Sequence, residues 1–191
     1  MRGGRSPHIG VIGGGVSGLS CGVLLLERGY RVTVMAREIT PDTTSDIAAA
    51  IWYPFRAWPQ NRVKEWCRLS LGHFRRLIDQ EADCGVYPVE FTELLPERSP
   101  DPWWSDLVDH FRHARPDELG ELHTDGYVFT VPFIDTPYYM PWLTEKFRQL
   151  GGEIRQQSVE TLSELASYDI IINCSGLGAR SLFGDEQVYP I

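Results

Sequence analysis

The sequence predicts an α/β fold in which a nucleotide-binding layer of strands and helices is interrupted by a mostly β module. Three observations carry this prediction: a glycine-rich turn joins an apolar strand to an amphipathic helix, a second apolar strand completes a β-α-β unit, and the middle of the chain adopts a strand-like pattern. The predicted layer spans residues 1–84 and 138–191, and the predicted module spans residues 85–137.

The first predicted elements form the β-α-β unit. Residues 8–12 are short, apolar and β-branched, which is typical of a parallel strand covered on both faces. The helix predicted over 16–28 has apolar residues at i, i+4 and i+7 from Leu19, and Gly29 follows where a left-handed C-cap is favoured. Residues 31–36 form the second predicted strand, so the chain begins as α/β.

The predicted β module follows a long surface helix. That helix is predicted over 61–83, because apolar residues recur at helical spacing among charged ones. Residues 86–91 and 127–131 are predicted strands, separated by loops rich in proline and acidic residues. Within these loops Trp103 and Trp104 are predicted to anchor the core of the module or an interface; the alternative is an aromatic lid over substrate.

The end of the chain returns to the α/β pattern. A helix is predicted over 141–150, followed by strands at 153–157 and 169–174. Asn173-Cys-Ser175 matches a glycosylation sequon, yet we expect it to be buried on the last strand.

The composition excludes several classes of protein. Eighteen Lys and Arg against 26 Asp and Glu give a formal net charge of −8, which disfavours nucleic acid and anionic lipid as partners. No apolar run approaches the ~20 residues of a membrane-spanning helix. Charge and run length together predict that neither nucleic acid nor a membrane is a partner. The four cysteines lack metal-ligand spacing, which predicts reduced thiols and no metal site. Because the first residues lack the apolar core of a secretory signal, we expect a cytoplasmic location.

Two histidines lie close together in an acid-rich stretch. His110 and His113, next to Asp109, could suggest a metal site or an acid–base group. The surrounding residues are helix-like and acidic, so we expect a solvated face instead.

The glycine-rich turn carries the main functional signal. It matches G-x-G-x-x-G, in which the glycines allow a tight turn, close approach of a pyrophosphate and packing of helix on strand. The pattern follows a strand, opens a helix and precedes an acidic residue about twenty positions later, so it predicts dinucleotide binding rather than a purely structural turn. The match consists of Gly13, Gly14, Gly15, Val16, Ser17 and Gly18.

Glu38 is the acidic residue that follows the second strand. Its carboxylate can accept hydrogen bonds from both hydroxyls of an adenosine ribose. The neighbouring Arg37 could instead favour a 2′-phosphate, which leaves NADP as a minor alternative. The remaining alternative is an exposed charge pair at a strand end.

The segment 40–54 combines hydroxyl-bearing, small and aromatic residues. Its hydroxyls and backbone N–H groups could hold a second phosphate, and its alanines would let the backbone approach a flat ring. Together with the glycine turn, the Asp101-Pro-Trp103 loop and Asn173-Cys-Ser-Gly-Leu-Gly178, it resembles the N-terminal part of the FAD-dependent D-amino-acid oxidase family, which includes D-aspartate oxidases. The resemblance covers nearly the whole chain and implies a Rossmann-like FAD-binding domain interrupted by a mostly β substrate-binding module.

The resemblance also implies an activity. Members of the family transfer the α-hydrogen of a D-amino acid as hydride to flavin N5, which yields a 2-oxo acid and ammonia, and O₂ reoxidises the flavin to give H₂O₂. The cofactor supplies this chemistry, so the protein needs mainly to bind and orient the substrate.

The cofactor contacts are likewise implied by the resemblance. The glycine turn would hold the pyrophosphate, and Arg37 and Glu38 would lie near the adenosine. The other implied contacts are Thr43, Thr44 and Ser45 with phosphate or ribityl groups, Ala50 and Ile51 with the isoalloxazine, Val159 through its backbone with adenine, and Ser175 and Gly176 at a strand end.

The sequence departs from the family pattern in three places. The acidic residue common at the ribose position in animal members is displaced by one, to Glu38. Tyr53 stands where many relatives carry an amide near the substrate, so the preferred side chain of the substrate is open. The family's substrate-binding Arg, active-site Tyr residues and second flavin motif would lie beyond Ile191, so no residue of this chain is assigned a catalytic role. We therefore expect an N-terminal piece whose remainder is a missing segment or a separate chain. A peroxisomal signal could lie in that remainder. Assembly into a homo-oligomer also stays open.

Three alternative functions stay open at this point. The first is a related flavin amine oxidase of the glycine or sarcosine type, which shares the N-terminal flavin half. A NADP-linked dehydrogenase and a nucleotide-binding module without catalysis are the others.

Overall fold

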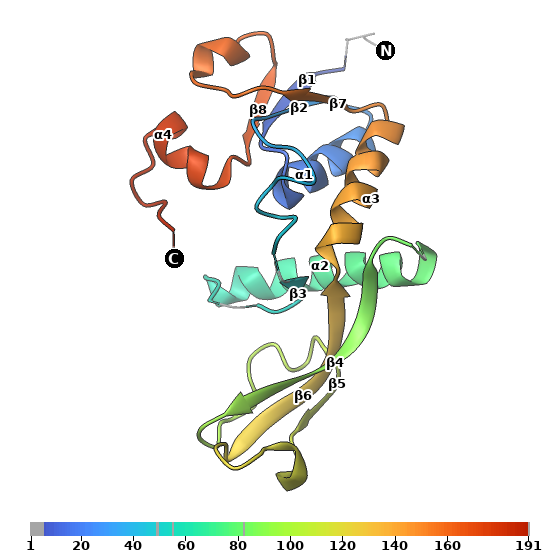
Figure 1. Ribbon diagram of the computed structural model, residues 1–191, viewed down its shortest axis with the longest axis vertical. Coiled ribbons are helices and arrows are strands. Elements are labelled where there is room, and N and C mark those ends of the chain that lie inside the picture. The colour runs from blue at the N-terminus through green and yellow to red at the C-terminus, as the bar shows by residue number, and fades with distance from the viewer. Residues whose placement is uncertain (1–5, 49, 55, 82, 191) are drawn as a thin grey trace. The chain divides into compact units, whose positions relative to one another are not determined.

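The computed structural model describes residues 6–48, 50–54, 56–81 and 83–190. The chain forms two compact units, of which the first combines Met1–Ala48 with Thr136–Ile191 and the second is Ala49–Asp135. Figure 1 shows both units with their elements labelled. The first unit is discontinuous in sequence, and the segment between residues 49 and 84, which we had grouped with the nucleotide-binding layer, belongs to the second unit.

The first unit contains a four-stranded parallel sheet in the order β7-β2-β1-β8. Its strands are β1 (His8–Ile12), β2 (Arg31–Ala36), β7 (Glu153–Gln156) and β8 (Ile170–Asn173). β1 lies at the centre, where its side chains are almost completely buried. Because all four strands run in the same direction, their carboxyl ends meet at one edge of the sheet.

Two helices of the first unit, α1 (Val16–Leu26) and α3 (Thr136–Gln149), pack against each other (Figure 1). A Cβ atom at Gly22 of α1 would lie 2.5 Å from the ring of Phe147, so this glycine permits close contact with α3. α3 begins at Thr136 and contains Pro141, so it starts more than one turn earlier than the helix predicted over 141–150. A short helix, α4 (Ala179–Phe183), follows β8.

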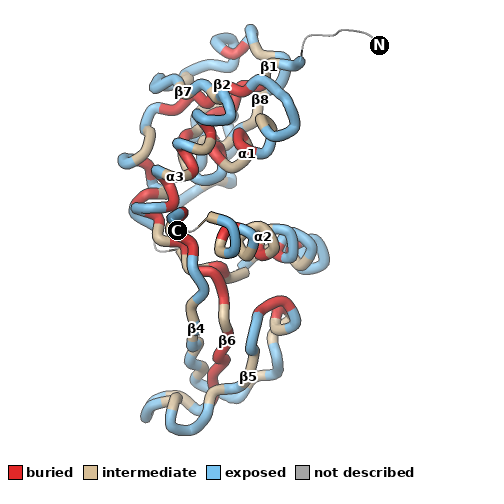
Figure 2. Tube along the Cα trace, turned by 90° about the vertical axis from the view of Figure 1, so that its right-hand side faces the viewer, coloured by how far each residue is buried: buried red, intermediate tan, exposed pale blue. Residues whose placement is uncertain are grey.

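The second unit is built on an antiparallel sheet. The ten residues of β4 (Val86–Leu95) pair with the ten of β6 (Asp125–Ile134), while β3 (Ala50–Ile51) and β5 (Asp109–His113) also pair with β6. The long helix α2 (Gln60–Gln80) completes the unit. β6 is therefore the central strand, and Figure 2 shows burial along most of its length.

An aromatic core joins α2 to this sheet. The helix contributes Val63, Cys67 and Leu71, which lie on the face that its apolar spacing predicted. Trp104 is 4% exposed and its ring packs edge-on against Phe129 with centroids 4.8 Å apart. The expectation that this tryptophan anchors a core is confirmed.

The stretch around the two histidines differs from its prediction. Residues 109–113 form strand β5, so the helix-like interpretation was wrong. Asp109, His110 and His113 are exposed, as expected of a solvated face. Phe111 packs edge-on against the buried Trp104, which explains why an acidic stretch forms a strand. His110 adopts a φ of 55° at a register shift between Asp109 and Arg112, and His113 enters a network of polar contacts.

The last strand is also less buried than predicted. Among the residues that the structure describes, β8 pairs only with β1, and Asn173 at its end is exposed. The expected burial of the Asn173-Cys-Ser175 sequon was therefore wrong. An apolar strand sequence predicts a covered strand, but an outer position in the sheet leaves one edge open.

Within the described ranges, no helix combines the length and apolar character that crossing a bilayer requires.

Candidate functional site

A cavity of about 660 Å³ opens in the first unit at the carboxyl ends of β1, β2 and β8. Ligands of open α/β sheets bind at this edge, and small-molecule sites typically measure ~300–1,000 Å³. Five stretches of chain line it, namely residues 12–17, 35–38, 43–45, 157–160 and 174–178, together with Ser181 and Leu182.

The glycine turn between β1 and α1 forms one wall of this cavity. Gly13 has a φ of 109°, which favours glycine, and a Cβ at this position would overlap the carbonyl group of Cys174. A Cβ at Gly18 would overlap the carbonyl oxygen of Gly13. The turn, the helix and β8 can therefore approach one another only because these positions lack side chains.

The N-terminus of α1 offers hydrogen-bond donors to the cavity. The N-cap residue is Gly15, which has no side chain to cap the helix, and the first helical bond runs from Leu19 N–H to the Gly15 carbonyl. The Val16 N–H donates to Ser45 Oγ at 3.0 Å, while Ser17 N–H has no acceptor within the helix. A helix N-terminus with such groups attracts anions, so this wall suits a phosphate or diphosphate.

The hydroxyl loop is held in a fixed conformation. The backbone N–H and the hydroxyl of Thr43 both donate to Asp46 Oδ2, at 2.9 and 2.5 Å. Thr136 of α3 donates its hydroxyl to the carbonyl oxygens of Asp46 and Ala48. Thr43, Thr44 and Ser45 consequently line the cavity as a single ordered segment.

Arg37 and Glu38 line the cavity just beyond the end of β2. Their side chains form an ion pair of 3.2 Å and are 77% and 50% exposed. The described contacts of the guanidinium involve Oε1 of Glu38 alone, so Oε2 is directed to no described partner. An exposed pair of this kind contributes little to stability, and the carboxylate can still accept hydrogen bonds from a diol.

The turn after β8 forms the opposite wall. Asn173 Oδ1 accepts hydrogen bonds from the N–H and the hydroxyl of Ser175, at 3.1 and 2.7 Å, and Gly176 follows with a φ of 55°. Burial, reinforced by the neighbouring Cys21, raises the pKa of the Cys174 thiol to about 11. Cys174 is therefore neutral near pH 7 and adds no negative charge beside a phosphate-binding wall.

Val159 links the cavity to the core of the first unit. It lines the cavity and packs against Ile12, Met35 and Leu165. The N–H of the adjacent Glu160 donates to a carboxylate oxygen of Glu164 at 3.1 Å. An apolar side chain with polar backbone groups beside it suits a flat heteroaromatic ring.

The structure brings most of the predicted cofactor-binding residues to this one cavity. Gly18 is not part of the lining but supports it from α1. The predicted residues that line it are Gly13, Gly14, Gly15, Val16, Ser17, Arg37, Glu38, Thr43, Thr44, Ser45, Val159, Ser175 and Gly176. Their roles toward a cofactor stay predictions.

Three predicted residues belong to the second unit. Ala50 and Ile51 form β3, and their predicted contacts with a flavin ring stay predictions. Tyr53 donates its hydroxyl to Glu93 Oε2 at 2.8 Å and packs edge-on against Trp104. Burial and the Glu93 carboxylate raise the pKa of Tyr53 well above its usual range, so the phenol stays protonated.

Some lining residues escaped the sequence analysis. Gln157 and Ser158 follow β7, and Leu177, Gly178, Ser181 and Leu182 follow β8. Their signal was positional, because each stretch comes directly after a predicted parallel strand, whose carboxyl end lies at the ligand-binding edge.

Comparison with known proteins gives concordant results. Residues 8–191 match the model of the FAD dependent oxidoreductase family. A D-amino-acid oxidase of Rubrobacter xylanophilus is 40% identical over 193 residues, which cover 100% of this chain and 59% of that protein. The human D-aspartate oxidase is 34% identical over 197 residues, which cover 97% of this chain and 58% of that protein.

A solved structure shares the fold. The glycine oxidase of Geobacillus kaustophilus superposes with a TM-score of 0.71 at 15% identity, over 94% of this chain and 58% of that chain. The chain thus spans less than two thirds of the length of each of these proteins.

Proposed function

The chain belongs to the FAD dependent oxidoreductase family, and from this premise we propose that it binds FAD in the cavity of the first unit as part of a D-amino-acid oxidase. The observation that carries the proposal is the convergence of the glycine turn, the hydroxyl loop and the turn after β8 on one cavity. The 40% identity to a D-amino-acid oxidase along the whole chain supports the choice of substrate class.

The residues of the cavity fit such a cofactor. The helix N-terminus beside Gly15 and Ser17 would bind the diphosphate, and Ser45 would add a hydroxyl. The carboxylate of Glu38 would accept from the ribose of the adenosine, and the backbone around Val159 would contact adenine. A side chain at Gly13 would overlap the backbone of Cys174, so the glycine at this position is what allows the two walls to approach each other.

The division of work between cofactor and protein follows from this arrangement. When bound, FAD supplies the chemistry of accepting hydride from the substrate α-carbon and of reoxidation by O₂ with formation of H₂O₂. The residues of this chain bind and orient the cofactor and keep it in a fixed position relative to the sheet. No group of this chain is assigned to the substrate carboxylate or amine.

The proposal therefore includes a second contribution to the active site. The chain spans 59% and 58% of the two relatives named above, so the substrate-binding groups would come from a C-terminal remainder, either in the same polypeptide or as a separate chain. All four cysteines are free thiols, which supports the proposed cytoplasmic location.

A related amine oxidase is the second candidate. The structural likeness to a glycine oxidase favours it, because the flavin-binding half is shared whatever the amine. Tyr53, with its hydroxyl on Glu93, stands at the position expected near the substrate and would influence the choice.

One experiment separates these functions. The protein is purified together with any segment or chain that copurifies, and its visible spectrum is recorded anaerobically before and after D-alanine, with sarcosine as the comparison. Bleaching of the flavin bands by D-alanine supports the D-amino-acid oxidase, and bleaching by sarcosine alone supports the second candidate. Flavin bands that neither substrate bleaches would overturn both activities.

A further inference from the structure

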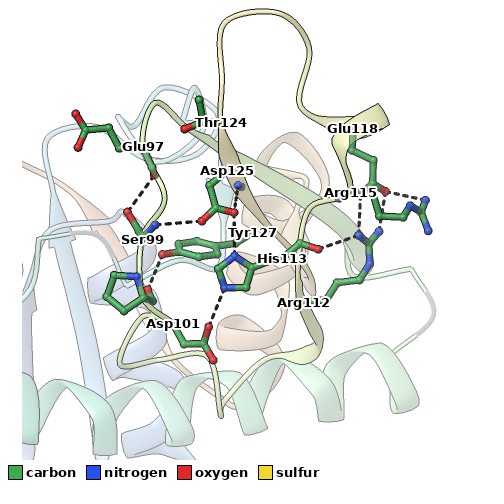
Figure 3. A network of polar contacts seen from close by, with 12 residues as sticks. Glu97, Ser99, Asp101, Arg112, His113, Arg115, Glu118, Thr124, Asp125 and Tyr127 are labelled. Carbon is green, nitrogen blue, oxygen red and sulfur yellow. Dashed lines mark hydrogen bonds and ion pairs between the residues drawn. The ribbon is translucent and has the colours of Figure 1, made fainter.

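A polar network in the second unit surrounds the imidazole of His113 (Figure 3). His113 Nδ1 lies 2.9 Å from Asp125 Oδ1 at the start of β6, and His113 Nε2 lies 2.9 Å from Asp101 Oδ1 in the loop after β4. The ring also packs edge-on against Tyr127, with centroids 5.4 Å apart. Side chains from three separate stretches of sequence thus meet at one ring.

The two carboxylates define the protonation state of this ring. An ionised carboxylate can only accept hydrogen bonds, and a neutral imidazole carries a single N–H. Both nitrogens of His113 face carboxylate oxygens at hydrogen-bonding distance, so both contacts form only when the imidazole is doubly protonated. Loss of one proton would leave a nitrogen lone pair facing a carboxylate oxygen.

The same network attaches a loop to β6. Asp125 is 6% exposed, and its Oδ2 accepts the backbone N–H of Ser99 at 3.1 Å. The hydroxyl of Tyr127 donates to the Pro100 carbonyl at 2.7 Å, and the hydroxyl of Thr124 donates to the Pro96 carbonyl at 2.8 Å. Residues 96–101 are therefore held by polar contacts rather than by apolar burial.

This loop leads directly into the aromatic core. Asp101 lies three residues before Trp104, whose ring contacts Phe111, Tyr127 and Phe129. Trp104 also packs edge-on against Tyr53 with centroids 5.3 Å apart. Movement of the loop would consequently reach the residue that we predict to lie near substrate.

We propose that His113 acts as a proton-dependent clamp, which holds the loop 96–101 on β6 while its imidazole is doubly protonated and releases the loop when a proton is lost. All members of the clamp belong to the second unit. Its ligand is the proton, and its moving part is the loop.

The two carboxylates that face the ring favour its protonated state, whereas desolvation opposes it. The carboxylates of Asp125 and Asp101 hold the pKa of His113 above its usual value. The Tyr127 ring faces it from β6, and the guanidinium of Arg112 on β5 donates to the His113 carbonyl at 3.3 Å and is paired with Glu118. A raised pKa in the folded state means that the contribution is complete below the ordinary value near 6.5 and is lost as the pH rises through the raised value.

Tryptic cleavage at the Arg98–Ser99 bond tests the clamp directly. The N–H of this bond is the one that Asp125 accepts, so cleavage requires release of the loop. Initial rates are measured between pH 6 and 9.5 on the purified protein and divided by the rates for a peptide of residues 94–104. Losing one hydrogen bond to a charged group changes a local opening equilibrium by about tenfold, so we expect the normalised rate to rise about tenfold over this range.

Two variants and a control make the test specific. His113→Gln should give a normalised rate that is high at pH 6 and independent of pH, and Asp101→Asn should move the midpoint to lower pH, because one of the two raising charges is gone. His123→Gln, in the loop before β6, should behave like the parent protein. A midpoint that Asp101→Asn leaves unchanged, or a pH profile that survives His113→Gln, would overturn the clamp.

Discussion

The cavity of the first unit and the His113 network of the second are built in different ways. The cavity consists mainly of backbone groups and small side chains, placed by short segments that each follow a parallel strand. The network consists of charged side chains from three stretches of the second unit, brought together by the pairing of β5 with β6 and by the loop after β4. In the cavity, a Cβ at Gly13 or Gly18 would overlap backbone atoms, whereas the network depends on the charges of its side chains.

The largest difference in the free energy of unfolding is expected when a glycine is replaced by alanine in a helix of each unit. Gly18→Ala in α1 places a Cβ on the Gly13 carbonyl, and overpacking of this kind costs ~1–3 kcal/mol or more. Gly72→Ala in α2 meets only the end of the Arg76 side chain at 3.9 Å, so the gain in helix propensity should stabilise the protein by up to ~1 kcal/mol. Urea unfolding measures both, and equal effects would contradict the close packing at Gly18.

The acid limit of stability should depend on the second unit. The His113 imidazole and the Ser99 N–H lower the pKa of Asp125 to about 2, and Arg112 lowers that of Glu118 to about 2. Because these values lie below those of unfolded carboxyls, the two contributions are complete above about pH 4 and are lost as the pH falls toward 2. Asp125→Asn should therefore flatten the acid transition followed by circular dichroism, and Asp117→Asn should leave it unchanged.

A smaller effect is expected at the N-terminus of α1. Ser45→Ala removes the acceptor of the Val16 N–H, and loss of a helix N-terminal contact costs about 1 kcal/mol. The free energy of unfolding in urea should fall by this amount, while Ser105→Ala in the second unit should change it by less than half as much. If both variants unfolded alike, the capping role of Ser45 would be wrong.

The smallest effect is expected at the exposed ion pair. Arg37→Ala should change the free energy of unfolding by no more than about 0.5 kcal/mol, because the Arg37–Glu38 pair is exposed to solvent. Thermal unfolding at low and high salt measures the difference. A loss of several degrees at low salt would show that the pair stabilises the end of β2.

The same contrast explains what the sequence could predict. The glycine turn, Glu38 and the hydroxyl loop were found because their signals are local, and a fixed spacing after a strand determines their place in the fold. β5 and the role of His113 were missed, because the partners of the imidazole lie twelve residues away in either direction. Spacing in one stretch of sequence cannot show which strands will pair.

The division into units shows a similar limit. α2 was predicted with the correct inward face, but its membership of the second unit depends on packing against Trp104 and Phe129. Helical periodicity identifies which face is buried and leaves open which sheet it covers. The exposure of Asn173 has the same origin, since strand sequence does not reveal position within a sheet.

Flavin content is the measurement that tests the central claim most directly. The protein is purified, passed through gel filtration and examined by visible absorption, with Glu38→Gln beside the control Glu27→Gln. We expect about one FAD per chain in the parent and the control, and weaker retention in Glu38→Gln, because a ribose hydrogen bond to a charged acceptor is lost. A colourless parent protein that takes up no added FAD would contradict the proposed role of the cavity.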